Sequence, residues 1–286
     1  MVELNRRDFG RIALGSGVAA HLAAAPKIDS TVRGVTIGVQ SYSFRDRPLD
    51  DAIKAMQEIG LGECELSQGH VEPARIPREE LRKWRTETPV DHFREIGQKF
   101  KDAGIELYAF NYSFREDFTD AEIDRGFEMA RAMGAQVITA SSNVSTAKRI
   151  DPFAQKYKMR VGMHNHSRIS PNEFATPEAF AEAMKGRSKY IAINLDIGHF
   201  TAAGFDAVQF LSEHHADILT LHIKDRKKNQ GDNVPLGEGD TPIKQVLALV
   251  RDKKLKIPAN IEYEYKGGDT VTEVRRCFDY CKQALA

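Results

Sequence analysis

Arg160–Ser167 reads RVGMHNHS and places two histidines, His164 and His166, at the end of a short apolar run. Residues two apart in a β-strand point to the same face, so the two imidazoles are expected on one face of a strand. Imidazole nitrogens bind metal ions, and the pair would form part of a metal site if neighbouring strands end in the same way. Taken alone, the two histidines fit a surface loop equally well.

The rest of the chain repeats the unit to which this segment belongs, a short apolar strand followed by an amphipathic helix. Eight such units over roughly 255 residues match the size of an α/β protein with a (β/α)8 TIM-barrel fold. A doubly wound open sheet, the rival, would have a glycine-rich phosphate-binding turn after its first strand, and QSYSFRDRP offers none. The expected strands are Thr36–Phe44, Gly62–Ser67, Ile105–Tyr112, Gln136–Ser141, Arg160–His166, Ile191–Asp196, Ile218–Lys224 and Pro258–Tyr265.

Composition excludes several classes of protein. The chain has 286 residues, and Lys plus Arg and Asp plus Glu both total 41, so the formal net charge is zero. This balance removes the electrostatic argument for binding nucleic acid or an anionic membrane surface. No apolar run reaches the roughly 18 residues that a membrane-spanning helix needs. The three cysteines imply no disulfide framework and are expected to pack in the core.

Residues 1–30 are set apart from the single barrel domain that is expected over residues 31–286. Asn5–Pro26 reads NRRDFGRIALGSGVAAHLAAAP, with a twin-arginine pair, a phenylalanine shortly after it and a stretch of small apolar residues. This pattern resembles a bacterial twin-arginine signal peptide, although Asn5 and Gly10 depart from the commoner residues. The resemblance predicts a periplasmic or secreted protein; an ordinary N-terminal amphipathic helix is the alternative.

Five expected strands become polar at alternate positions near their C-terminal ends, where a barrel strand should be apolar on both faces. Because the apolar residues between them must face the helices, the polar set is expected to face the barrel interior at the mouth, where barrel active sites lie. Burying so many ionisable groups is costly unless they pair or bind a cation. A structural network of ion pairs is the alternative. The polar set is Glu63, Glu65, His164, His166, Asn194, Asp196, Thr220, His222, Lys224, Asn260, Glu262 and Glu264.

His, Asp and Glu side chains together form a mixed set of nitrogen and oxygen ligands. Such a set suits one divalent ion of the Mn²⁺, Zn²⁺, Co²⁺ or Fe²⁺ type better than Ca²⁺. The sequence has neither a CxxC nor an HExxH motif, so a structural zinc site is not expected.

The order and spacing of these motifs resemble the sugar phosphate isomerase/epimerase family of xylose isomerase-like barrels, over nearly all of residues 35–286. The resemblance implies a barrel whose mouth holds one divalent metal ion, with ligands from four strands. By position, these ligands are His164, Asp196, His222 and Glu262. Many members have a glutamate in place of the first, and the histidine is typical of an HNH-type branch. The matching motifs are HNH at 164–166, LDIGH at 195–199, LHIKD at 221–225, GEGD at 237–240 and IEYE at 261–264.

The resemblance also implies proton abstraction next to a carbonyl group of a sugar or keto-sugar, through an enediolate. Members that epimerise free ketoses use two metal-bound carboxylates, and with His164 in place only Glu262 keeps that role. Isomerisation, or elimination by a lyase or dehydratase, therefore gains weight over simple 3-epimerisation. Glu65 is a candidate second carboxylate, with an ion pair to Lys224 or an arginine as its alternative role. His166 is the candidate acid.

Substrate contacts are expected from the strand ends and from the loops around the mouth. His199 follows Asp196 by three residues, where the family contacts substrate oxygens, and Lys224 would hold an anionic oxygen. The remaining candidates are Tyr42 and Phe44, which would stack on a sugar ring, and His70 and Trp84, which would cover the substrate.

Two other classes compete with a sugar enzyme. An apurinic-site endonuclease would need more metal ligands and basic loops that face DNA, and zero net charge argues against it. A non-catalytic sugar-binding barrel would have little reason to keep four ligand-type residues at its strand ends. The expected partner is thus a small sugar, without nucleic acid or a membrane span. An exported enzyme would meet free sugars, keto-sugars or oxidised glycosides rather than sugar phosphates. The sequence does not decide between a monomer and a homo-oligomer.

Overall fold

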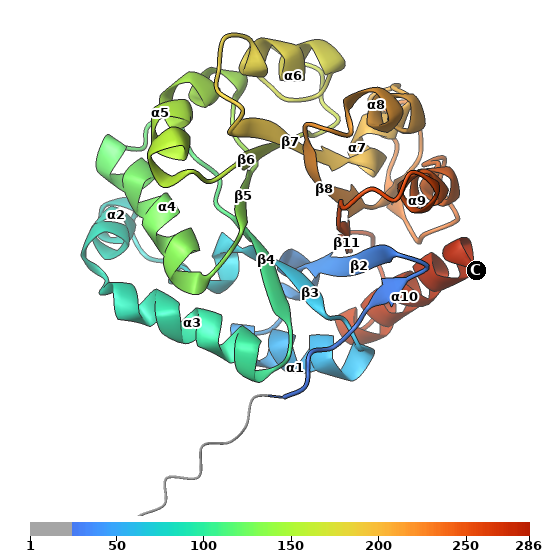
Figure 1. The fold of residues 1–286 in the computed structure, drawn as a ribbon, viewed down its shortest axis with the longest axis horizontal. Helices are drawn as coiled ribbons and strands as arrows, with labels where there is room; N and C mark the ends of the chain where they lie inside the picture. The colour runs from blue at the N-terminus through green and yellow to red at the C-terminus, as the bar shows by residue number, and fades with distance from the viewer. Residues whose placement is uncertain (1–24) are drawn as a thin grey trace, which may run out of the picture.

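Eight parallel strands close into a ring in the computed structural model, which describes residues 25–286 (Figure 1). Each strand pairs with the next along the chain, and the last pairs with the first, so the barrel has no open edge. The predicted (β/α)8 fold is confirmed. The barrel strands are β2 (Val35–Gln40), β3 (Glu63–Ser67), β4 (Glu106–Asn111), β5 (Val137–Ala140), β6 (Val161–His164), β7 (Ile191–Asp196), β8 (Ile218–Ile223) and β11 (Ala259–Ile261).

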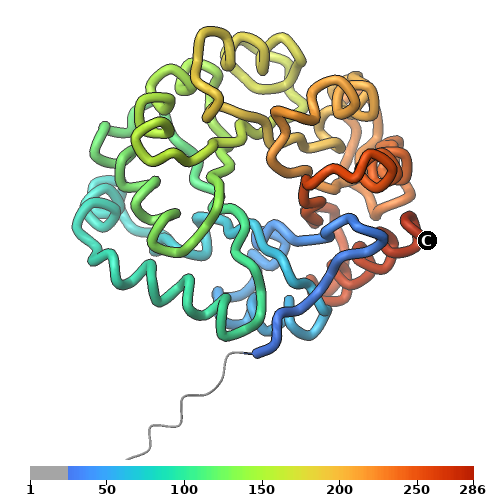
Figure 2. The backbone as a smooth tube through the Cα atoms, viewed as in Figure 1, coloured from blue at the N-terminus to red at the C-terminus, as the bar shows by residue number. Residues whose placement is uncertain are grey.

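Helices surround the strands and cover their outer face (Figure 1). The chain comes full circle, and Figure 2 shows its C-terminal helix beside the first barrel unit. The short elements are β1 (Thr31–Val32), β9 (Asp225–Arg226), β10 (Asn233–Val234) and the 3-10 helices η1 (Ser41–Phe44), η2 (Gln68–His70) and η3 (Val144–Thr146). The helices are α1 (Leu49–Ile59), α2 (Arg78–Glu87), α3 (Val90–Asp102), α4 (Asp120–Met133), α5 (Ala147–Tyr157), α6 (Pro177–Met184), α7 (Ile197–Ala202), α8 (Ala207–His214), α9 (Ile243–Asp252) and α10 (Thr270–Leu285).

Three barrel strands end two or more residues earlier than the sequence predicts. The strand β2 stops at Gln40, because the Gln40 side chain accepts a hydrogen bond from the Tyr42 N–H and begins η1. The strand β6 ends at His164, and β11 ends at Ile261. Residues expected at strand ends, His166 and Glu262 among them, therefore lie in the loops just above the barrel.

The barrel interior divides into two levels. The floor, near the N-terminal ends of the strands, contains a small apolar cluster and the buried side chain of Glu63. The mouth, at the C-terminal ends, contains the other ionisable residues of the expected polar set, so Glu63 lies deeper in the barrel than the sequence predicts. The apolar floor cluster consists of Ala109, Val137, Ala192 and Leu219, with Tyr108 packed against them.

Residues 25–30, which the sequence assigns to a linker, contact the floor side of the barrel. The Ala25 and Ile28 N–H groups donate to the carbonyls of Asp102 and Gly104, and Ser30 Oγ accepts from the Gly62 N–H. The twin-arginine motif lies outside the described residues. Within residues 25–286, no helix has the length and apolar character needed to cross a membrane.

Candidate active site

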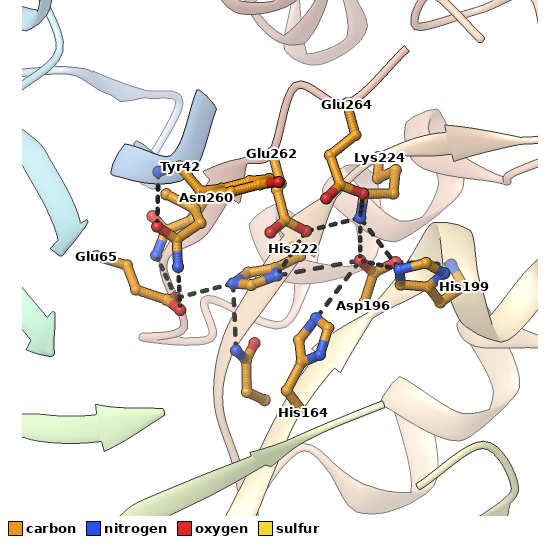
Figure 3. Close-up of polar contacts among 12 residues, drawn as sticks. Tyr42, Glu65, His164, Asp196, His199, His222, Lys224, Asn260, Glu262 and Glu264 are labelled. Atoms are coloured by element: carbon orange, nitrogen blue, oxygen red, sulfur yellow. Dashed lines mark hydrogen bonds and ion pairs between the residues drawn. The ribbon is translucent and has the colours of Figure 1, made fainter. Parts of the chain in front are cut away.

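Four side chains from neighbouring strands meet at the mouth: His164, Asp196, His222 and Glu262. One possible ligand atom of each lies within 4.8 Å of those of the other three. The barrel register brings them together, because Asp196 on β7 lies opposite His222 on β8, and His222 lies opposite Asn260, two residues before Glu262. Figure 3 shows His222 between Glu65 on one side and Asp196 on the other. The four ligands expected from the sequence are thus brought together.

The donor set fits a divalent cation. His164 Nε2 and Asp196 Oδ2 lie 3.6 Å apart, both buried, and neither forms a hydrogen bond within the described residues. The other nitrogen of His164 is in contact with Ser141 Oγ at 3.3 Å, so Nε2 is the one left over. Buried polar atoms without partners are rare in proteins. An ion bound by the two imidazoles and two carboxylates would satisfy His164 Nε2 and would share Asp196 Oδ2 with the Lys224 ammonium group, 3.1 Å away.

Asn165 positions one of these ligands. Its amide accepts from the Asp196 N–H at 2.9 Å and donates to the Asp196 carbonyl at 3.0 Å. The Asp196 carboxylate in turn accepts from the His199 N–H at 2.7 Å and caps the N-terminus of α7. The backbone and one oxygen of Asp196 are therefore fixed, and Oδ2 is directed toward the ligand cluster.

Lys224 lies in a network of carboxylates. Its side chain is buried, and Nζ is 2.6 Å from Glu264, 2.8 Å from Glu262 and 3.1 Å from Asp196. Burial alone would lower the pKa of Lys224, but the three carboxylates raise it above its usual value. The pKa of Glu262 lies well below its usual range, because Lys224 and His222 outweigh the effect of burial. The ammonium group expected to hold a substrate oxygen thus already pairs with protein carboxylates.

Glu65 does not lie where the sequence predicts. Its side chain is completely buried beneath His222, and Oε2 lies 2.9 Å from His222 Nε2. The expectation of a second carboxylate facing the substrate does not fit this position. An ion pair with Lys224 does not form either, since Lys224 pairs with the carboxylates named above.

His166 and His199 form an imidazole cluster with His164 at the mouth. The His166 ring centroid lies 5.0 Å from that of His164 and 5.4 Å from that of His199. The His166 backbone N–H donates to the Phe174 carbonyl, so the residue belongs to the loop after β6. Although His166 is exposed, desolvation by surrounding groups and the adjacent His164 lower its pKa to about 4.

Arg226, a residue that the sequence did not single out, holds the Nδ1 side of the His199 ring. Its Nη1 lies 2.7 Å from His199 Nδ1 and 2.7 Å from Ser167 Oγ, while Nε and Nη2 donate to the Gly231 carbonyl. An arginine can only donate, so His199 Nδ1 accepts. The available signal was its place directly after the LHIKD motif.

The two aromatic residues expected to stack on a sugar ring have different surroundings. Tyr42 is 41% exposed, with the Arg45 guanidinium 5.0 Å from its ring centroid. Phe44 is fully buried in the core, so its expected stacking on a sugar ring is wrong. Both residues lie in the 3-10 helix η1 rather than in a strand, so residues two apart no longer share a face, and Tyr42 points outward while Phe44 points into the core.

His70 and Trp84, from the segment after β3, contact other parts of the protein rather than the open mouth. One ring nitrogen of His70 is 2.9 Å from Ser41 Oγ, and the other lies 3.3 Å from the Phe44 carbonyl and 3.2 Å from that of Arg47. Both nitrogens hold the loop after β2, so the expected substrate contact is not supported. Trp84 packs in an edge-to-face contact within the helical layer, where it does not cover the mouth.

The GEGD segment is wrapped around Asp225. The Asp225 carboxylate accepts hydrogen bonds from the N–H groups of Gly237, Gly239 and Thr241. A Cβ at Gly239 would collide with Asp225 Oδ1, so glycine is required by close approach. This arrangement secures the long segment after β8 beside the candidate ligands.

Residues 53–283 match the sequence profile of the xylose isomerase-like TIM barrel. The chain belongs to this family. An uncharacterised protein of Methanocaldococcus jannaschii is 29% identical to this xylose isomerase-like barrel over 114 residues, which make up 39% of this chain and 39% of that protein.

Solved structures of similar shape include two bacterial proteins. An uncharacterised protein of Parabacteroides distasonis is 25% identical, with a TM-score of 0.63 over 87% of this chain and 99% of that one. A 3-keto-D-glucoside 4-epimerase of E. coli has a TM-score of 0.67 over 87% of this chain and 99% of that one. Its sequence identity is 13%, so the likeness shows the fold alone. The structural neighbours of this xylose isomerase-like barrel thus include a sugar epimerase.

Proposed function

We propose that this protein is a divalent-metal-dependent isomerase or epimerase that removes a proton next to a carbonyl group of a sugar or keto-sugar. The observation that carries the proposal is the cluster of His164, Asp196, His222 and Glu262, in which the buried His164 Nε2 has no hydrogen-bond partner within the described residues. An ion held by these residues would polarise the carbonyl group and stabilise the enediolate. The epimerase among the structural neighbours supports the same substrate class.

Glu262 is the residue assigned to proton removal. It is the one carboxylate of the cluster that follows its strand rather than ending it, and its side chain is 10% exposed where that of Asp196 is fully buried. Lys224, 2.8 Å from Glu262 Oε2, keeps the carboxyl ionised and ready to accept a proton. His166 and His199, whose ring centroids lie 5.0 Å and 6.0 Å from that of His164, would return a proton or bind substrate hydroxyls.

Elimination by a lyase is the second candidate, and the position of Glu65 favours it over two-carboxylate epimerisation. With Glu65 completely buried under His222, the candidate second carboxylate does not face Glu262 across the mouth. One base and an imidazole acid are enough to expel a substituent next to an enolate, or to move a carbonyl group along the chain. Turnover in D2O separates these outcomes: an isomerase or epimerase gives a product of unchanged composition with carbon-bound deuterium, and a lyase releases a leaving group.

Export and the HNH-type branch form part of the proposal. The Arg6–Arg7 pair and the histidine at position 164 support them. An exported enzyme would act on a free sugar, a keto-sugar or an oxidised glycoside. Cell fractionation of the full chain and of an Arg6→Lys, Arg7→Lys variant tests export: the variant should remain in the cytoplasm, and equal periplasmic amounts of both would contradict it.

Metal analysis tests the core of the proposal. The purified protein should contain close to one divalent ion per chain after incubation with Mn²⁺ or Zn²⁺ and removal of the excess. A ligand at about 100 times its Kd stabilises by about 2.7 kcal/mol, so chelation should lower the Tm by about 5–10 °C for a domain of this size. Less than about 0.2 ion per chain, with a Tm that chelation does not change, would reject the metalloenzyme.

A further inference from the structure

Hydrogen-bond donors surround the buried carboxylate of Glu65. Its Oε1 accepts from Thr139 Oγ1 at 2.6 Å and from Gln40 Nε2 at 3.0 Å. Its Oε2 lies 2.9 Å from His222 Nε2 and 3.4 Å from Asn260 Nδ2. Because one of these four contacts leads to a candidate metal ligand, the direction of each hydrogen bond decides what Glu65 does.

Groups outside the cluster fix the donors at Oε1. The Tyr42 backbone N–H donates to Gln40 Oε1 at 3.0 Å, so the Gln40 amide presents Nε2 to Glu65. Asn111 Nδ2 donates to Thr139 Oγ1 at 3.1 Å, which leaves the hydroxyl hydrogen of Thr139 for Glu65. An amide and a hydroxyl therefore both donate to Oε1.

A backbone carbonyl fixes the donor from Asn260 in the same way. Thr220 Oγ1 donates to the Pro258 carbonyl at 3.2 Å, so it accepts from Asn260 Nδ2 at 3.0 Å. The same Nδ2 faces Glu65 Oε2. Three donors favour the ionised form of Glu65, and a carboxylate only accepts. His222 Nε2, on the fourth side, must therefore carry a hydrogen.

We propose that Glu65 is a positioning residue that fixes the tautomer and orientation of His222, and with them the affinity of the site for its divalent ion. A neutral imidazole carries hydrogen on one nitrogen and a lone pair on the other. With hydrogen on Nε2, the lone pair of His222 lies on Nδ1, 3.1 Å from Glu262 Oε2 and 4.0 Å from Asp196 Oδ2. This inference rests on the proposed metal-dependent function, and it replaces the proton-transfer role expected for Glu65.

The surroundings of Asn194 agree with this assignment. Its Nδ2 lies 3.2 Å from His222 Nε2, and its Oδ1 is buried without a hydrogen-bond partner among the described residues. Turning the amide by 180° would place Oδ1 against the N–H of His222. A hydrogen on Nε2 therefore also provides a donor for an oxygen that otherwise lacks one.

Glu63 provides a matched control on the same strand. It lies two residues before Glu65, is only 3% exposed, and neither of its oxygens forms a hydrogen bond in the described part of the chain. The same Glu→Gln change can therefore be made at two buried positions of β3, of which only one touches a candidate ligand.

Calorimetric titration of the metal-free full chain with Mn²⁺, against a competing chelator, compares the two variants. Glu65→Gln should lower the Mn²⁺ affinity about 10–100-fold, because an amide orients and polarises His222 less strongly than a carboxylate. Glu63→Gln should match the wild type. Wild-type affinity in Glu65→Gln would overturn the proposal, whereas a wild-type chain that binds neither Mn²⁺ nor Zn²⁺ would overturn the proposed function instead.

A spectroscopic measurement reads the tautomer directly and needs no variant of Glu65. In the Zn²⁺-loaded wild type with ¹⁵N-labelled histidine, His222 should show a slowly exchanging hydrogen on Nε2 and none on Nδ1. A hydrogen on Nδ1 would overturn the proposal. Because the wild-type chain suffices, the result is decisive even if Glu65→Gln does not fold.

Discussion

The mouth and the floor of the barrel both bury carboxyl groups, but they surround them in opposite ways. At the mouth, Asp196 and Glu262 lie within 3.1 Å of Lys224. On the floor, both oxygens of Glu63 lack hydrogen bonds within the described residues, and burial, together with Glu65, raises the pKa of Glu63 well above its usual value. Burial by itself favours the neutral acid, and only neighbouring cations and donors keep a carboxylate charged. The charge of the mouth is therefore assembled by residues from different strands.

Asp196→Asn should have the largest effect, because it removes one of the charged carboxylates that distinguish the mouth from the floor. The amide keeps an oxygen for the cap of α7 but removes the negative charge from the ligand cluster. We expect metal affinity to fall more than about 100-fold and turnover to drop to background, with the fold retained. Metal content by mass spectrometry, steady-state kinetics and circular dichroism check these outcomes. A variant that still binds close to one ion per chain would contradict the ligand role of Asp196.

Glu262→Gln should remove turnover while leaving most of the fold and some metal binding. Loss of a general base typically lowers kcat about 10²–10⁴-fold. Glu264→Gln is the matched control, because Glu264 also contacts Lys224, at 2.6 Å, but lies outside the ligand cluster. Equal losses of kcat in both variants would show that the Lys224 network, rather than a base at position 262, is what the reaction needs.

Glu63→Gln should increase the free energy of unfolding, by an amount that depends on pH. Below the unfolded pKa of about 4.3, Glu63 is protonated in both states and has no effect. As the pH rises toward the higher folded pKa, the unfolded chain ionises first, which costs the native wild type about 1.4 kcal/mol per pH unit. In urea unfolding, the advantage of the variant should therefore grow as the pH rises above the unfolded pKa and should level off at the folded pKa. A difference that stays constant with pH would mean that the pKa of Glu63 is not raised.

Tyr42→Ala at the rim of the mouth should have the smallest effect. Tyr42 is 41% exposed, and stacking of an aromatic ring on a substrate contributes about 0.5–1.5 kcal/mol, or about 2–12-fold in KM. We expect kcat to stay near the wild-type value, and Tyr42→Phe to restore KM. An unchanged KM in Tyr42→Ala would place the substrate elsewhere in the mouth.

The strands and helices of the barrel could be predicted because their patterns depend only on residues that are close together in the sequence. Alternation along each strand and the spacing of amphipathic helices identified all eight strands and the barrel. The residues at which strands end were harder to predict. The strand β2, for example, ends because the Gln40 side chain accepts a hydrogen bond from the Tyr42 N–H. That one early ending turned Phe44 from an expected substrate contact into a core residue.

The sequence by itself determined which residue types stand at the mouth, since side-chain direction alternates along a strand and the apolar half must face the helices. Alternation therefore placed His164, Asp196, His222 and Glu262 in the polar set, and the family resemblance selected these four as the ligands. The tertiary structure alone decided what each polar neighbour does, because hydrogen bonds between strands depend on the register and closure of the whole barrel. Only the closed barrel brings Glu65 on β3 against His222 on β8, 157 residues away along the chain.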